Sequence, residues 1–134
     1  MKPTLSRIAQ ISMTARDMPR AIAFYRDTLG MKHLFDAGPG LSFFDCDGIR
    51  LMLSLPEKGG EAGASSILYF KVDDVHATFR ELAGRGVAFE RPPHLVARTP
   101  AHALWMAFLR DSEGNLLAIT SEQPLEAGGR ADAP

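Results

Sequence analysis

The chain has 134 residues, a formal net charge of −1 and 46% hydrophobic residues, which predicts one soluble globular domain over residues 1–134. Its composition excludes a chain that is disordered throughout, and no apolar run reaches the roughly 18 residues of a membrane span. The N-terminal residues lack the apolar stretch of a secretory signal, and no basic cluster predicts a nucleic-acid partner. Because the single cysteine, Cys46, cannot form an internal disulfide, we expect a cytoplasmic protein.

The first half of the chain predicts a strand, a helix and three further strands. Period-two alternation predicts a strand over 8–15, and Asp17 is typical of a helix N-cap. Gly30 is typical of the residue that follows a helix. The helix has an apolar stripe of Met18, Ala21, Ile22, Tyr25 and Leu29. The strands that follow are expected at 32–36, 41–44 and 49–55.

The second half predicts the same order of elements. A strand is expected over 67–72, and Asp74 is typical of the N-cap of a helix that ends at Gly84 or Gly86. The apolar stripe of this helix is Val75, Thr78, Phe79, Leu82 and Ala83, and His76 in its first turn is expected to be exposed. The remaining strands are expected at 87–96, 103–109 and 115–121.

These two halves form an internal repeat, because Asp17 aligns with Asp74 and Gly48 aligns with Gly114, each within a similar stretch. The prediction is an α+β fold of two tandem β-α-β-β-β modules. Module one covers about residues 5–58 and module two about 64–122, with a linker at 59–64 that is rich in glycine. Residues 123–134 show no apolar period and are expected to be a disordered tail.

Two motifs carry a resemblance to a known family. Ala23 to Gly30 resembles the FY-x-x-x-LG signature of the vicinal oxygen chelate superfamily, and Asp111 to Leu117 resembles its D-P-x-G-N hairpin, with Ser112 in the place of proline. The resemblance implies the glyoxalase/bleomycin-resistance fold, a curved mixed sheet with helices on the convex face. It also implies a homodimer, which would cover the open sheet edges, and a small-molecule ligand. The fold hosts many activities, so the motifs do not identify one.

In the enzymes of this superfamily, a divalent metal is bound by His, Gln or Glu side chains from the first and fourth strands of each module. Counting from the capping and hairpin aspartates, the corresponding positions here are Gln10, Met52, Ile67 and Ala118. A hard cation needs several oxygen or nitrogen donors, and Gln10 alone supplies one. We therefore expect no metal and no cofactor at this place.

Strand alternation predicts a wall of mixed polar and apolar residues, which is typical of a small-molecule pocket. An anionic or aromatic ligand would suit its positive charges and its tyrosine. Trp105 and the pair Phe43–Phe44 are candidate stacking surfaces, and His94 and His102 are an alternative pair of metal ligands or general bases. The candidate ligand-binding residues are Gln10, Ser12, Arg50, Met52, Ile67, Tyr69, Lys71, Ala118, Trp105, His94 and His102.

Three functions remain open from the sequence. The first is a metal-free protein that binds a small molecule in a cup formed by the concave face of the curved sheet, as bleomycin-resistance proteins do. The second is an enzyme of the superfamily, a lyase, isomerase or dioxygenase, with a non-standard metal set or a histidine acid/base site. The third is a module whose cup binds nothing.

Overall fold

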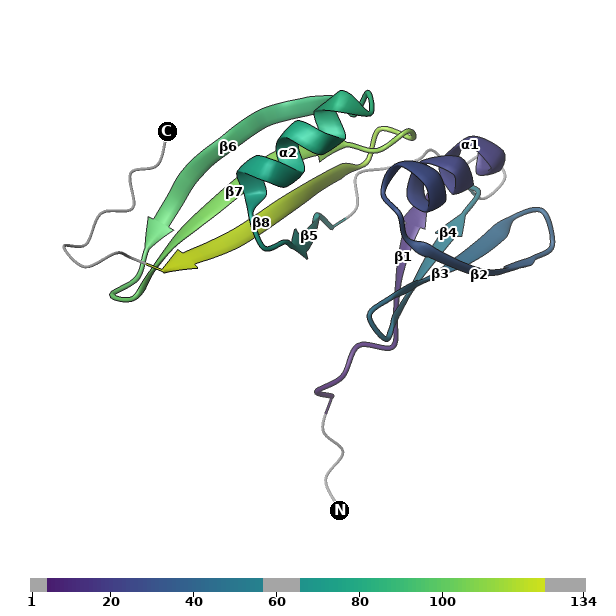
Figure 1. Ribbon diagram of the computed structural model, residues 1–134. Coiled ribbons are helices and arrows are strands. Elements are labelled where there is room, and N and C mark those ends of the chain that lie inside the picture. Colours follow the sequence, from purple (N-terminus) through teal and green to yellow (C-terminus); the bar gives the residue numbers. More distant parts are fainter. Residues whose placement is uncertain (1–4, 57–65, 125–134) are drawn as a thin grey trace, which may run out of the picture. The chain divides into compact units, whose positions relative to one another are not determined.

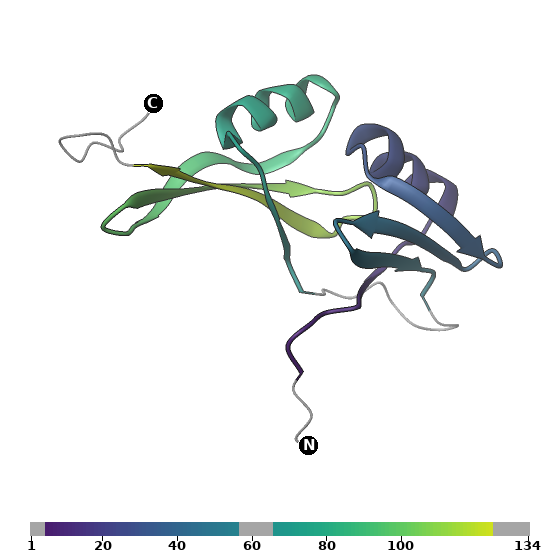
Figure 2. The same cartoon turned by 60° about the horizontal axis from the view of Figure 1, so that its bottom comes forward.

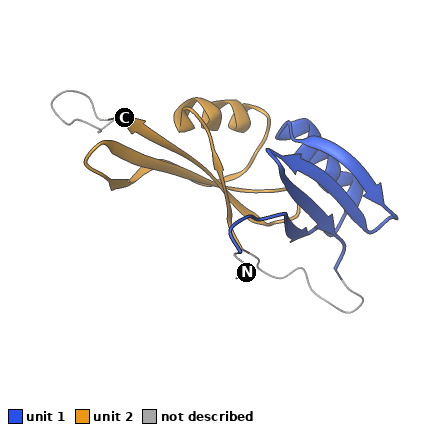
Figure 3. Ribbon diagram, turned by 90° about the horizontal axis from the view of Figure 1, so that it is seen from below, with its two compact units in different colours: residues 1–65 blue, residues 66–134 orange. Residues whose placement is uncertain are grey.

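The computed structural model describes residues 5–56 and 66–124. They belong to two compact units, residues 1–65 and residues 66–134, shown in different colours in Figure 3. The predicted linker at 59–64 and residues 125–134 of the predicted tail lie outside the described residues. Both units have the predicted order β-α-β-β-β, so the predicted α+β fold is confirmed.

Unit 1 is a four-stranded sheet in the order β1-β4-β3-β2 with a helix packed on one face (Figure 1). β1 is parallel to β4, and the other neighbours are antiparallel. A short π-helix, η1, continues the first helix. The elements are β1 (Gln10–Thr14), α1 (Met18–Ala23), η1 (Phe24–Thr28), β2 (Lys32–Ala37), β3 (Leu41–Cys46) and β4 (Ile49–Ser54).

Unit 2 repeats this topology in the order β5-β8-β7-β6, with α2 lying along one face of the sheet (Figure 2). Again the first strand of the unit is parallel to its last, β5 to β8. β8 continues to Pro124, two residues into the segment that was expected to be a disordered tail. The elements are β5 (Leu68–Lys71), α2 (Val75–Gly84), β6 (Phe89–Arg98), β7 (His102–Arg110) and β8 (Leu116–Pro124).

The two helices begin in the same way. The side chain of Asp17 accepts a hydrogen bond from the backbone N–H of Arg20 at 3.1 Å, and the side chain of Asp74 accepts from the N–H of His76 at 3.0 Å. Both aspartates satisfy N–H groups that a helix start leaves without a partner. The predicted N-caps are therefore confirmed.

Within the described residues, neither helix is long and apolar enough to cross a membrane.

The first helix differs from the single regular helix that was predicted. The N–H of Leu29 donates to the carbonyl of Phe24 at 2.9 Å, which is the i→i+5 spacing of a π-helix. This wider turn includes Tyr25, which is fully buried and donates its hydroxyl to Sδ of Met13 at 3.7 Å. The apolar stripe still faces the sheet, because Met18, Ala21 and Tyr25 are all buried.

In both units the core lies between the helix and one face of the sheet. The buried residues of β1 and β4 are Met13, Leu51 and Leu53, which alternate with exposed or half-buried neighbours. In unit 2, β7 alternates in the same way, with Ala103, Trp105, Ala107 and Leu109 buried. We call the sheet face opposite the helix the open face of each unit.

In each unit a turn joins the last two strands, β3 to β4 in unit 1 and β7 to β8 in unit 2. The aspartates before these turns, Asp45 and Asp111, accept different sets of hydrogen bonds. In unit 1, Asp47 (φ 51°) and Gly48 (φ 91°) form a two-residue turn with two positive φ angles, as tight hairpins prefer. In unit 2, Asp111 is buried, and its carboxylate accepts the N–H groups of Glu113 at 2.8 Å and Asn115 at 2.7 Å. The side-chain amide of Asn115 donates to the other carboxylate oxygen at 2.8 Å.

This difference predicts unequal costs for the same substitution. Asp111→Ala should lower the free energy of unfolding by about 2 kcal/mol, because it leaves one buried and two part-buried donors without their charged acceptor. Asp45→Ala in the shorter turn, where the half-buried carboxylate accepts one bond from Gly48 at 3.2 Å, should cost less than about 1 kcal/mol. Urea denaturation of both variants measures the pair. Equal losses would contradict the role assigned to Asp111.

Candidate functional site

The open face of unit 1 carries four of the predicted wall residues. Parallel pairing of β1 with β4 places Gln10 opposite Arg50 and Ser12 opposite Met52. Residues paired in register point to the same side of a sheet. In agreement, the side-chain amide of Gln10 donates to Sδ of Met52 at 3.7 Å. The structure therefore brings these four side chains to one surface.

Two phenylalanines extend this surface across β3 and β2. Phe43 is paired with Met52 and Phe35 with Phe43. The rings of Phe35 and Phe43 stack with centroids 4.6 Å apart and planes inclined by 22°. Phe43 is buried, whereas Phe35 is 45% exposed. The result is an aromatic platform with one accessible ring.

Arg50 lies over both rings of that platform. Its Cζ atom is 5.6 Å from the centroid of Phe35 and 5.6 Å from that of Phe43. Attraction between the cation and the negative faces of the rings holds the guanidinium there. Within residues 5–56 and 66–124, that guanidinium has no hydrogen-bond or ion-pair partner. Its N–H groups are therefore available to a ligand.

The open face of unit 2 has an aromatic surface of its own. Tyr69 and Phe108 are the register partners of Ala118 on its two sides, and Lys71 is paired with Thr120. The rings of Tyr69 and Phe108 meet edge to face at 6.1 Å, and His94 stacks on Phe108 at 6.0 Å. Of the predicted wall residues, Tyr69, Lys71, Ala118 and His94 thus lie on this face.

Phe43 and Phe108 occupy equivalent places in the repeat. Each is on the third strand of its unit and is paired with the fourth-strand position predicted for a metal ligand, Met52 or Ala118. Phe35 and Phe108 were not among the wall residues predicted from the sequence. Alternation along 103–109 contained the signal for Phe108, because it is in phase with Met106 and out of phase with buried Trp105 and Ala107.

A β-bulge explains why Phe35 was harder to find. His33 is paired with Phe44 on the helix-covered face, and strict alternation would return Phe35 to that face. The register shifts between His33 and Phe35, so Phe35 is paired with Phe43 instead. An extra residue in one strand reverses the sides of those that follow it.

Two predicted stacking residues lie on the other side of their sheets. Trp105 is 5% exposed and packs beneath α2, with its ring 4.9 Å from that of His76. Phe44 is fully buried against Tyr25. His76 was expected to be exposed, but its side chain is only 22% exposed because it covers Trp105, whereas Ala83 of the predicted stripe is exposed. The predictions that Trp105 and Phe44 form stacking surfaces, that His76 is exposed and that Ala83 belongs to the buried stripe are therefore wrong.

His94 and His102 do not meet across their hairpin. His94 is paired with Met106, and His102 lies at the start of β7, where it is paired with Pro124. Nδ1 of His94 is 2.8 Å from the carbonyl oxygen of Pro92. His94 on β6 therefore lies opposite the middle of β7, whereas His102 lies at the start of β7, and the two side chains have different neighbours.

The predicted metal positions do not offer a suitable donor set. In unit 1, Gln10 is bonded to the thioether of Met52, which is a soft and weak donor. In unit 2, Ile67, which directly precedes β5, and Ala118 have hydrocarbon side chains. Across the described part of the chain, no group of three or more His, Cys, Asp or Glu residues is arranged to hold a metal ion.

A polar cluster on the helix-covered face of unit 1 is internally satisfied. Ser42 is fully buried and donates to Oδ1 of Asp36 at 2.7 Å, while Nε2 of His33 lies 2.8 Å from the same oxygen and 3.1 Å from Oγ of Ser42. The bond from Ser42, followed by that from His33, lowers the pKa of Asp36. Because the hydroxyl proton of Ser42 goes to a carboxylate, the cluster is not a histidine-activated nucleophile.

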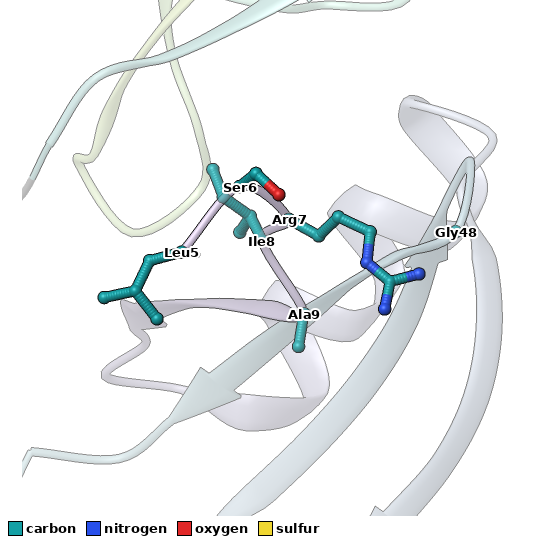
Figure 4. Close-up of a pocket in the computed structure, with 6 residues that line it drawn as sticks. All are labelled: Leu5, Ser6, Arg7, Ile8, Ala9 and Gly48. Atoms are coloured by element: carbon teal, nitrogen blue, oxygen red, sulfur yellow. The ribbon is translucent and has the colours of Figure 1, made fainter. Parts of the chain in front are cut away.

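A hollow of about 430 Å³ lies along the segment that precedes β1 (Figure 4). Its lining consists of the consecutive residues 5–9 and Gly48 of the β3–β4 turn. Leu5 is fully exposed and Ile8 is 63% exposed, so the hollow is open surface. It contains none of the predicted wall residues.

The chain is similar to proteins of known sequence and structure. It is 29% identical over 126 residues to YraH of Bacillus subtilis (strain 168), covering 84% of this chain and 96% of YraH. It resembles the structure of TnmS3, an antibiotic binding protein from Streptomyces sp. CB03234, with a TM-score of 0.71, 26% identity, and coverage of 91% of this chain and 100% of TnmS3.

A third comparison shows the same fold. Lactoylglutathione lyase from Agrobacterium tumefaciens has a TM-score of 0.75 and 23% identity, with 88% of this chain and 95% of that chain covered. The model of the Glyoxalase/Bleomycin resistance protein/Dioxygenase superfamily matches residues 7–119. The chain therefore belongs to the Glyoxalase/Bleomycin resistance protein/Dioxygenase superfamily, as the two sequence motifs predicted.

Proposed function

We propose that this protein binds a small anionic or aromatic molecule on its open faces without a metal. The observation that carries the proposal is the guanidinium of Arg50 above the stacked rings of Phe35 and Phe43, which has no hydrogen-bond or ion-pair partner among the described residues. A surface with accessible apolar area and a few directed polar groups is typical of a ligand site. Similarity to an antibiotic binding protein supports a binding role.

A screen of small molecules by thermal shift tests this proposal. We expect anionic or aromatic compounds to raise the melting temperature in buffer containing a metal chelator, because a ligand at about 100 times its dissociation constant stabilises the folded state by about 2.7 kcal/mol. The control is Arg26→Gln, which removes a positive charge away from the open face and should keep the same shift in melting temperature. Arg26 is exposed on η1 and paired with Asp27. Stabilisation seen solely after adding a divalent metal would contradict a metal-free site.

We further propose that the purified protein holds no divalent ion at the family position. The reason is donor chemistry, since the amide of Gln10 and the thioether of Met52 are weak ligands for a hard cation. Elemental analysis after dialysis against metal-free buffer should find zinc, nickel, iron and manganese far below one equivalent. A stoichiometric metal that Gln10→Ala removes would overturn this expectation.

One observation favours a second function, an enzyme that uses His94 as a base. Nδ1 of His94 faces the carbonyl of Pro92 and so carries the proton in the neutral ring, which leaves Nε2 as the basic nitrogen. Stacking on Phe108 fixes the ring on the open face of unit 2. If His94→Gln abolished turnover of a bound compound while preserving its binding, the enzyme hypothesis would replace the binding protein.

We also propose that residues 1–134 act as one domain, and that the protein is a cytoplasmic homodimer. In their sheets, β1 and β5 are edge strands with one neighbour each, and such edges are normally covered. Leu5 and Ile8, which precede β1, expose apolar side chains that a partner could bury. Light scattering at micromolar concentration should give about twice the chain mass of 14.6 kDa. A mass of one chain would contradict the dimer.

A further inference from the structure

We propose that the open face of unit 1 is specific for a planar aromatic carboxylate, whose acid group binds Arg50 and whose ring packs on Phe35. This inference rests on the proposed binding function and names the chemical class of its ligand. It follows from the joint placement, on one surface, of an accessible ring and a guanidinium that no described residue pairs.

Arg50 has the geometry of a preorganised carboxylate receptor. Its Cζ is 5.6 Å from each of two ring centroids, so stacking limits the positions that the side chain can take. The guanidinium presents its N–H donors as a planar fork, which matches the two oxygens of a carboxylate. A side chain that is already positioned loses less entropy when the ligand binds.

Neighbouring charges leave this receptor free. Asp45 is the register partner of Arg50 on β3, but Oδ1 of Asp45 accepts the N–H of Gly48 at 3.2 Å, and no ion pair joins Asp45 to Arg50 within the described residues. On its other side Asp45 is paired with Lys32, whose positive charge offsets that of the carboxylate. Lys32 and Arg50 thus place two positive charges on either side of the one carboxylate of Asp45.

Phe35 supplies the contact for the aromatic part of the ligand. Its ring is stacked on Phe43 and is 45% exposed, so one partner fixes the ring while part of its surface stays accessible. A planar ligand ring can pack against the exposed part of Phe35 while its acid group reaches Arg50, whose Cζ atom is 5.6 Å from the centroid of that ring. An aliphatic acid would gain the ion pair without the stacking, and a neutral aromatic would gain the stacking without the ion pair.

The test uses 2-naphthoate and its neutral isostere 2-naphthamide as probes of the full-length protein. Calorimetric titration should give a dissociation constant for the acid at least about tenfold below that for the amide. Arg50→Gln should remove this preference, Arg50→Lys should retain part of it, and Phe35→Leu should weaken both probes together. Arg26→Gln, which removes an equal charge from a paired arginine on η1, should change neither constant.

The outcomes separate the two proposals. Equal affinity for acid and amide, or a preference that survives Arg50→Gln, would overturn the carboxylate inference while leaving a binding protein. Failure of both probes to bind at about 10 mM would also overturn it, and the binding function would then fall as well if the thermal-shift screen found no ligand. Arg50 is exposed, so its variants should melt within a few degrees of the parent; a larger shift is controlled by comparing the two probes on each variant.

Discussion

Each unit depends on the packing of a capped helix against one face of a four-stranded sheet. Asp17 and Asp74 start the helices at equivalent points of the repeat, and the apolar stripes then bury one face of each sheet. Because strand residues alternate sides, this packing decides which side chains remain accessible. Parallel pairing of the first and fourth strands then aligns their accessible residues, so that Gln10 and Met52 meet on one surface.

The donor atoms at these positions differ from those expected at the metal centres of enzymes in this superfamily. Where four donors would be expected, the chain has one amide, one thioether and two hydrocarbon side chains. Aromatic rings occupy the neighbouring strand in both units, with Phe43 and Phe108 in equivalent places. Arg50 places a positive charge on the same open face of unit 1.

Much of the fold was predictable from the sequence because its signals are local. Aspartate caps, glycines after the helices and alternating strands placed the elements to within a few residues, including the wall positions Ser12 and Arg50. The exceptions arise where a strand is irregular. A bulge after His33 moves Phe35 to the open face. Such shifts depend on pairing between strands, which alternation within one strand cannot reveal.

Side chains at helix starts were the other source of error. His76 has the position of an exposed first-turn residue, yet it packs against Trp105 from β7. Trp105 in turn was a candidate stacking surface, although its phase with Ala103 and Ala107 places it in the core. Whether a large aromatic on a regular strand joins the core or the site is therefore decided by its phase along that strand, as the contrast between Trp105 and Phe108 on β7 shows.

Methionine oxidation tests the assignment of the two sheet faces most directly. Met52 and Met13 lie on the adjacent strands β4 and β1, but Met52 is half-buried on the open face, whereas Met13 is 2% exposed beneath the helix. Sulfoxide formation follows access of the thioether to the oxidant. Brief treatment of the native protein with hydrogen peroxide, followed by peptide mass spectrometry, should show Met52 oxidised well before Met13. Equal rates, or faster oxidation of Met13, would contradict the open face on which the proposed site is built.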